Sequence, residues 1–152
     1  MQLDRIDRKI LKVLQEDGRI KNLELAEIVN LSSTPCAKRV KKLEERGIIS
    51  GYSANIGAIA AGYQICAFVL IEISSNTREA ANQFAKQIKD ISAITECHMT
   101  SGSLDYIAKV YAKSLKDYES VIKDELGKIE VIAKIESMII LDNILPTRGI
   151  SV

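Results

Sequence analysis

One short basic segment is the first place in this chain where residue types and spacing indicate a chemistry. The segment NLSSTPCAKRVKKLEERG, residues 30–47, has a polar, turn-forming start and then apolar residues at Cys36, Val40 and Leu43. Lysine and arginine occupy most positions between these three. The spacing predicts a helix with one apolar and one basic face. Such a basic face is suited to binding phosphate groups.

The residues just before this helix favour a particular arrangement of two helices. Ala26 is small enough for close contact between helices, and Asn30 tolerates the left-handed backbone of a tight turn. This pattern matches a helix-turn-helix, in which the later helix lies in the major groove of DNA. An ordinary basic surface helix remains an alternative. A membrane-surface helix is disfavoured, because no bulky aromatic residue borders the apolar stripe.

The outward side of the basic helix and its amino-terminal end form the candidate DNA-binding surface. Ser32 or Ser33 is expected to cap the helix, which leaves backbone N–H groups free to bind a phosphate. Arg39 and Arg46 are expected to reach the DNA backbone from the sides. The candidate DNA-contacting residues are Ser32, Ser33, Thr34, Pro35, Ala37, Lys38, Arg39, Lys41, Lys42 and Arg46.

Two further helices are predicted before the basic one. The first covers about residues 4–15 and is capped by Asp4; the second covers about residues 23–29 and is capped by Asn22. Residues 47–56 have the composition of extended structure. The small-residue segment after them has no pattern and is the candidate linker. The predicted domains are therefore a helix-turn-helix unit over residues 1–56, a linker over 57–63 and a second domain over 64–152.

The second domain alternates between strand and helix patterns. A near-continuous apolar, β-branched run over residues 63–74 predicts a buried strand. An amphipathic helix from Thr77, two strands joined by the turn SGSL, a helix opened by Ser114 and a long last strand follow. The order βαββαβ describes a ferredoxin-like α+β sandwich, with an antiparallel sheet and both helices on one face.

Composition argues against a membrane-spanning protein and a secreted one. The net charge is only +1, so the overall charge gives no indication of nucleic-acid binding. The longest apolar run, residues 65–71, is too short to cross a bilayer. The chain has no signal-peptide pattern at its start. Three widely spaced cysteines, Cys36, Cys66 and Cys97, contain no CxxC pair and predict reduced thiols in a cytosolic protein without a structural metal or cofactor.

Three segments together resemble the leucine-responsive regulator/AsnC family of transcription factors: LDRIDRKILKVLQEDGR, STPCAKRVKKLEERGIISGY and ECHMTSGSLDYIAKV. The similarity covers about residues 2–142 and is greatest to the leucine-responsive branch. The resemblance implies a winged helix-turn-helix that binds double-stranded DNA and a ferredoxin-like domain that binds an amino-acid effector. It also implies a homodimer formed through the sheets, assembly into octamers, and a cytoplasmic, nucleoid-associated location.

The resemblance further implies an effector site in the turn after the second strand. Hydroxyl and backbone N–H groups there suit the carboxylate of an amino acid, and Asp105 suits its ammonium group. The alternative is a plain hairpin turn, with Gly102 at positive φ and Asp105 bonded to the turn backbone. The candidate effector residues are Met99, Thr100, Ser101, Gly102, Ser103, Leu104, Asp105 and Tyr106, with Glu130 and Ser137 as candidates from a partner subunit.

Three functions are consistent with this sequence. The first is a DNA-binding transcriptional regulator modulated by an amino acid, and the resemblance to the leucine-responsive branch favours an apolar one such as leucine. The second is an architectural DNA-compacting protein that is indifferent to ligands. The third is an enzyme, since some similar proteins catalyse tetrapyrrole decarboxylation; the second domain offers it only His98, Arg78 and Arg148, without a nucleophile–base pair. The sequence predicts no catalytic residues and no enzyme activity.

Overall fold

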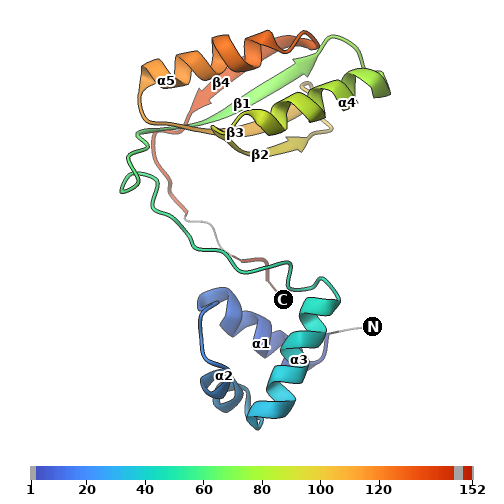
Figure 1. The fold of residues 1–152 in the computed structure, drawn as a ribbon, viewed down its shortest axis with the longest axis vertical. Helices are drawn as coiled ribbons and strands as arrows, with labels where there is room; N and C mark the ends of the chain where they lie inside the picture. Colours follow the sequence, from blue (N-terminus) through green and yellow to red (C-terminus); the bar gives the residue numbers. More distant parts are fainter. Residues whose placement is uncertain (1–2, 146–148, 152) are drawn as a thin grey trace. The chain divides into compact units, whose positions relative to one another are not determined.

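The computed structural model describes residues 3–145 and 149–151 and divides the chain into two compact units. The first unit contains the chain up to Asn55, together with the short segment Gly149–Ser151. The second unit runs from Ile56 to Leu145. Figure 1 shows the helices of the first unit and the sheet of the second.

Three helices make up the first unit: α1 (Arg5–Glu16), α2 (Asn22–Val29) and α3 (Ser33–Glu45). Asp4 caps α1 as predicted, because its carboxylate accepts hydrogen bonds from the backbone N–H of Ile6 (2.8 Å) and of Asp7 (2.7 Å). Asp7 completes a capping box by accepting from the backbone N–H of Asp4 (3.3 Å). The side-chain amide of Gln15, near the end of α1, donates to the carbonyl oxygen of Ile150 (3.0 Å).

A small apolar core holds the three helices together. Periodic apolar positions on each helix supply it, because every third or fourth residue of a helix lies on the same face. The buried residues are Ile10, Leu11, Leu25, Ala26, Val29, Cys36 and Leu43.

The corner between α2 and α3 has the backbone that the sequence predicts. Asn30 has φ +58° and ψ +50°, which is the left-handed conformation, and Gly47 ends α3 at φ +65°. The prediction that Asn22 caps α2 is wrong: Lys21 occupies the cap position, and the Asn22 side chain bonds to Ser33 instead.

The segment after α3 forms no strand. Residues 47–56 were expected to be extended, and they have no ladder partner in the described structure. Tyr52 attaches this segment to α3, because its hydroxyl donates to Oε1 of Glu44 (2.9 Å). The backbone N–H groups of Ile48 and Ile49 also donate to the carbonyl of Leu43 (3.0 and 3.2 Å), so contacts with α3 rather than strand pairing hold the segment.

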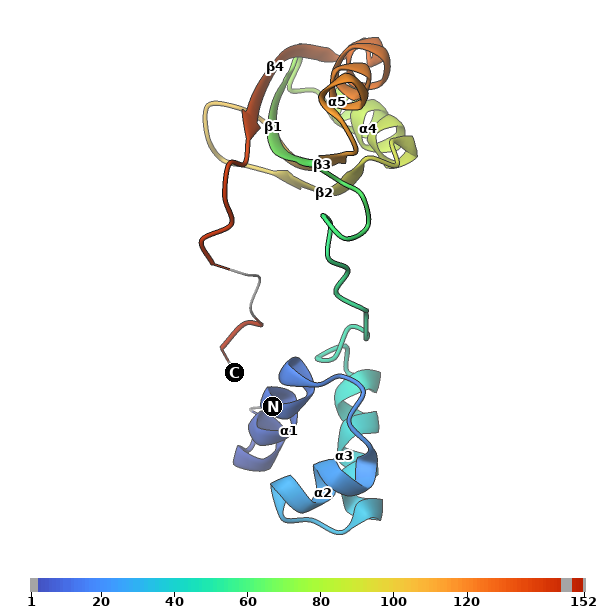
Figure 2. The ribbon, with the colours of Figure 1, turned by 90° about the vertical axis from the view of Figure 1, so that its left-hand side faces the viewer.

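The second unit is a four-stranded antiparallel sheet with its helices on one face. The strands are β1 (Ile65–Ile73), β2 (Ile94–Met99), β3 (Tyr106–Ala112) and β4 (Ile132–Ile139), in the order β2-β3-β1-β4. The helices are α4 (Arg78–Gln87) and α5 (Leu115–Ser120), and Figure 2 shows both on the same side of the sheet. The predicted βαββαβ order and ferredoxin-like arrangement are thus confirmed.

The two faces of the sheet have different surroundings. Alternate residues of β1 and β3, such as Val69, Ala108 and Val110, are fully buried beneath the helices. On the opposite face Phe68 is 36% exposed and its cross-strand neighbour Met138 is 50% exposed. This second face, on which Lys109 and Glu136 lie beside the apolar residues, has no covering layer within residues 56–145. In the described part of the chain, none of the helices combines the length and apolar character that crossing a membrane requires.

Candidate nucleic-acid interface and effector pocket

Helix α3 presents one side to its own unit and the other to solvent. Cys36 and Leu43 are buried against α1 and α2. The predicted DNA-contacting residues Thr34, Pro35, Ala37, Lys38, Lys41 and Lys42 are all exposed. Since successive helical residues are rotated by about 100°, Thr34, Lys38 and Lys41 share the side directly opposite the buried stripe. The exposed side therefore combines small residues with basic ones.

The amino-terminal end of α3 is free of acidic side chains. Ser32 occupies the cap position, but its side chain makes no capping hydrogen bond, and the first turn contains no Asp or Glu. Ser33 is half-buried, and its Oγ accepts from the Asn22 amide. The first backbone N–H groups of a helix have no partner within the helix, and the helix dipole places positive charge there. This end of α3 therefore favours an anion.

The exposed lysines of α3 differ in their neighbours. Lys41 lies 3.7 Å from Glu45, one turn further along the helix, and both side chains are largely exposed. Such a solvated pair contributes little to stability and is easily exchanged for a phosphate contact. No ion pair among the described residues involves Lys38 or Lys42. Arg46 is exposed at the carboxyl-terminal end of the helix.

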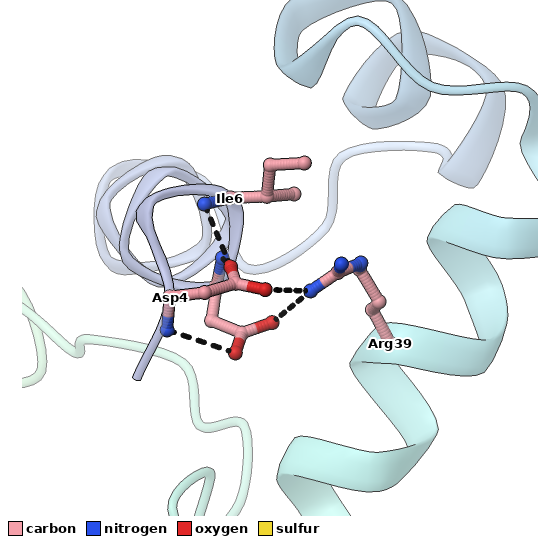
Figure 3. Close-up of polar contacts among 4 residues, drawn as sticks. Asp4, Ile6 and Arg39 are labelled. Atoms are coloured by element: carbon pink, nitrogen blue, oxygen red, sulfur yellow. Dashed lines mark hydrogen bonds and ion pairs between the residues drawn. The ribbon is translucent and has the colours of Figure 1, made fainter. Parts of the chain in front are cut away.

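Arg39 does not point to the solvent side with the lysines. Its Nη1 lies 2.6 Å from Oδ2 of Asp4 and 2.7 Å from Oδ1 of Asp7, so the guanidinium is directed at the start of α1 (Figure 3). These carboxylates raise the pKa of Arg39, Asp4 more than Asp7. The prediction that Arg39 reaches the DNA backbone from the side conflicts with this geometry, because both bonds hold the side chain within its own domain.

The predicted effector turn joins β2 to β3 and is closed by backbone and side-chain hydrogen bonds. The backbone N–H of Thr100 donates to the carbonyl of Asp105 (2.8 Å), and the Thr100 hydroxyl donates to the carbonyl of Leu104 (2.6 Å). The tip residues Ser101, Gly102 and Ser103 are exposed. Gly102 does not have a positive φ, so that part of the hairpin-turn alternative is wrong.

Asp105 links the turn to the central strand. Its Oδ2 accepts from the backbone N–H of Ile73 (2.8 Å), and its own backbone N–H donates to the carbonyl of Ile71 (3.0 Å). The plain-turn alternative required the Asp105 carboxylate to bond to the turn backbone. The carboxylate instead accepts from β1. The bond to Ile73 occupies Oδ2 and leaves Oδ1 for another donor.

A cavity of about 250 Å³ lies beside this turn. Four of the predicted effector residues line it: Met99, Thr100, Asp105 and Tyr106. The other wall consists of residues that the sequence reasoning missed, namely Ile73, Asn76, Thr77 and Ala81. Met99 is 73% exposed at the rim, whereas Tyr106 is buried with its ring centroid 4.3 Å from that of Phe84.

The remaining predicted effector residues do not line this cavity. Ser101, Gly102, Ser103 and Leu104 belong to the turn itself. Glu130 is exposed just before β4, at the end of the sheet where Ile132 pairs with Ile73. Ser137 lies further along β4, opposite Val69. Within the residues that the structure describes, no three His, Cys, Asp or Glu side chains are grouped as a metal site.

These features define a class of protein: a helix-turn-helix DNA-binding unit with a basic outward helix, joined to an α+β unit that contains a small-molecule cavity. Comparison with known families agrees. The winged helix-turn-helix DNA-binding family matches residues 3–50, and the Lrp/AsnC ligand binding domain family matches residues 66–150. The chain belongs to the Lrp/AsnC family of DNA-binding transcriptional regulators, in which the second domain binds an amino-acid ligand.

Individual relatives cover nearly the whole chain. The leucine-responsive regulatory protein of Rhizobium meliloti is 37% identical over 139 residues, which is 91% of this chain and 89% of that protein. Its counterpart in Escherichia coli K12 is 34% identical over 142 residues, covering 93% and 87%. A transcriptional regulator of Neisseria meningitidis solved with L-Met has a TM-score of 0.91 at 31% identity, covering 96% and 94% of the two chains. Escherichia coli AsnC has a TM-score of 0.90 at 26% identity, covering 99% of each.

Proposed function

We propose that α3 of this regulator enters the major groove of operator DNA, and that an apolar amino acid in the β2–β3 cavity controls the binding. The observation that carries the first half is the single outward face of α3, where Thr34, Lys38 and Lys41 are exposed opposite the buried stripe. The lysines neutralise phosphates, and the small residues allow close approach to base edges. Ser32, Ser33, Pro35, Lys42 and Arg46 are proposed as flanking DNA contacts.

The chemistry of the cavity supports an amino-acid ligand. Oδ1 of Asp105 is suited to accept a charge-assisted hydrogen bond from an ammonium group. Ile73, Ala81 and Met99 give the same cavity apolar walls for an aliphatic or thioether side chain. One relative is named leucine-responsive and another was solved with L-Met, which favours leucine or methionine. Ser101, Gly102, Ser103 and Leu104 are proposed to contact the ligand's carboxylate, and Glu130 and Ser137 to approach it from a partner subunit.

The uncovered sheet face supports self-association. Phe68, Leu70, Ile107 and Met138 lie on it as cross-strand neighbours, beside the charged Lys109 and Glu136. An exposed apolar patch bordered by polar residues is typical of an interface. We propose a homodimer through this face that assembles further, to an octamer. Each dimer would place two α3 helices in successive major grooves, with half-sites about one helical turn apart. Residues 57–63 are proposed as the linker, and nucleoid DNA in the cytoplasm as the place of action.

Two observations favour this proposal over the alternatives. An enzyme on this scaffold is disfavoured because His98, the only histidine, is exposed on edge strand β2, outside the cavity beside Asp105. An architectural protein indifferent to ligands is disfavoured by the cavity itself and by the match to a ligand-binding domain.

The test of the DNA-binding half is the salt dependence of operator affinity. Each phosphate contact contributes about 0.9 to the slope of log affinity against log salt. Lys38→Gln and Lys41→Gln should therefore each reduce the slope by about that amount. Lys116→Gln, which removes an exposed charge from α5, serves as the control and should leave the slope unchanged. An unchanged slope in both α3 variants would refute the placement of α3 on DNA.

The test of the effector half is a thermal-shift panel of the twenty amino acids, followed by gel shifts with any amino acid that raises the melting temperature. A ligand that binds only the native protein raises its apparent stability. Leucine or methionine should raise the melting temperature and change operator affinity. If no amino acid does either, the ligand-independent architectural function is the better description.

A further inference from the structure

We infer that Arg39 is a positioning residue for the recognition helix: with Asp4 and Asp7 it fixes α3 against the start of α1, and it does not bind phosphate. This inference rests on the proposed placement of α3 in the DNA groove. The three side chains, called the Asp4–Asp7–Arg39 cluster below, are drawn in Figure 3.

The hydrogen bonds of the cluster join the α1 cap to α3. In Asp4, Oδ1 accepts from two backbone N–H groups of the first turn, while Oδ2 accepts from Arg39. In Asp7, Oδ2 accepts from the backbone N–H of Asp4, while Oδ1 accepts from Arg39. Each carboxylate thus uses one oxygen to begin α1 and the other to hold α3. The same two groups that define the start of α1 therefore also define where α3 lies against it.

The burial of Asp7 makes its pairing with Arg39 important for the stability of the first unit. Asp7 is only 7% exposed and is the one charged residue in the buried set of the described chain. A buried carboxylate destabilises the folded state unless it is paired and hydrogen-bonded. Removing only its partner is more destabilising than replacing both residues by apolar ones, because it leaves a buried charge unpaired. Arg39 is the only cation with an ion pair to Asp7 among the described residues. Both bonds come from Nη1, so a single nitrogen at the end of the arginine side chain joins the two carboxylates.

The place of Arg39 on α3 supports a positioning role. Residues 36, 39, 40 and 43 follow helical spacing, so Arg39 lies on the side of α3 that Cys36 and Leu43 bury. The exposed Thr34, Lys38 and Lys41 lie on the other side. Because the helix is rigid, a rotation permitted by loss of the cluster would move every one of these side chains together. Arg39 is then expected to affect DNA affinity without meeting the DNA.

The salt dependence of operator binding separates the two roles in the full-length protein. Arg39→Gln should weaken binding by about the same factor, roughly tenfold, at every salt concentration and leave the salt slope unchanged. Lys38→Gln in parallel should lower the slope by about 0.9. A reduced slope for Arg39→Gln would show a direct phosphate contact and overturn the inference. If Lys38→Gln also fails to change the slope, the proposed placement of α3 fails first.

The variant Asp7→Asn gives a second test, because positioning and simple electrostatics predict opposite changes in DNA affinity. If electrostatics toward DNA were the only effect, Asp7→Asn would tighten binding, because it removes a negative charge near a polyanion. Positioning by the cluster predicts weaker binding instead. The double variant Asp7→Asn/Arg39→Gln should then lose less than the sum of the two single losses, because both remove one interaction. Additive losses, or tighter binding by Asp7→Asn, would overturn the inference.

A conservative variant guards against simple unfolding. Arg39→Lys keeps the charge, and its ammonium nitrogen carries enough hydrogens to donate to both carboxylates, as Nη1 of Arg39 does. It should keep more of the wild-type affinity than Arg39→Gln does, again without a change in slope, while circular dichroism shows its helices intact. A loss in Arg39→Lys as large as that in Arg39→Gln would mean that a cation at this position does not hold α3, and would overturn the inference.

Discussion

The side-chain amide of Asn22, the first residue of α2, donates two hydrogen bonds to Ser33, the first residue of α3. One goes to the Ser33 carbonyl oxygen (3.0 Å) and one to its Oγ (2.7 Å). The pair fixes the amino-terminal ends of the two helices to each other across the turn. Ser33 Oγ accepts in this bond, so the hydroxyl keeps its own hydrogen for donation to another acceptor.

The Asn22–Ser33 pair gives a first prediction. Asn22→Ala removes both hydrogen bonds, and we expect it to destabilise the helix-turn-helix unit by about 1–2 kcal/mol. Native-state hydrogen exchange of the α2 and α3 amides measures this loss directly. Asn82→Ala, an exposed change on α4, should stay within about 0.5 kcal/mol of wild type. Equal exchange protection in the two variants would mean that the pair has no energetic weight.

The turn residue Asn30 gives a second prediction. Its φ of +58° is unfavourable for residues with a Cβ other than Asn and Asp. Asn30→Ala should cost about 1 kcal/mol, whereas Asn30→Gly should retain most of the stability, because glycine adopts this conformation freely. Differential scanning calorimetry of the two variants checks the order. If alanine proves as stable as glycine, strain at this corner is not what Asn30 relieves.

Asn30 and Asn22 also show which features of the fold can be predicted from the sequence and which cannot. The left-handed turn at Asn30 was predictable, because the reason for it lies in the residue itself and its flanking helix pattern. The partner of Asn22 was not, since Ser33 lies across the corner and an asparagine before an apolar run looks like a cap. The ion pairs of Arg39 were not predictable for the same reason, because its carboxylate partners precede it by 35 and 32 residues. Residues 47–56 have strand composition but lack a ladder partner, which no short window of sequence reveals.

The residues that line the cavity beside Asp105 also include some that the sequence predicted and some that it did not. Resemblance to a family identified the β2–β3 turn, which is one continuous segment. The opposite wall, with Asn76 and Thr77, comes from the connection between β1 and α4. Only the antiparallel pairing of β1 with β3, which places Ile71 opposite Tyr106, brings the two segments together. Sequence patterns predicted both strands but not their register.

Asp105 gives a third prediction, which separates its structural bond from its proposed ligand bond. Asp105→Ala leaves the Ile73 N–H without its acceptor and should cost the sheet unit about 1–3 kcal/mol. In Asp105→Asn the side-chain carbonyl still accepts from Ile73, so stability should be largely kept, but the negative charge for an ammonium group is lost. The amino-acid-induced rise in melting temperature should therefore disappear in Asp105→Asn. Asp90→Asn, an exposed carboxylate elsewhere in this unit, should keep that rise, and an undiminished rise in Asp105→Asn would exclude Asp105 as the ammonium acceptor.

The pH dependence of the first unit gives a fourth prediction, through Asp4. The backbone N–H of Asp7, and then the Arg39 guanidinium, hold the pKa of Asp4 below its ordinary value of 3.8. A carboxyl group whose pKa is lower in the folded state stabilises that state above its unfolded pKa, and the contribution is lost as pH falls through the folded pKa. The stability difference between wild type and Asp4→Asn should thus be constant above about pH 5 and shrink below about pH 4, where Asp4 of the unfolded wild-type chain takes up a proton. Thermal unfolding across this pH range measures this stability difference, with Glu27→Gln on the exposed side of α2 as the control.

If the stability difference between wild type and Asp4→Asn persists undiminished at about pH 2, the charge of Asp4 is not what links α1 to Arg39.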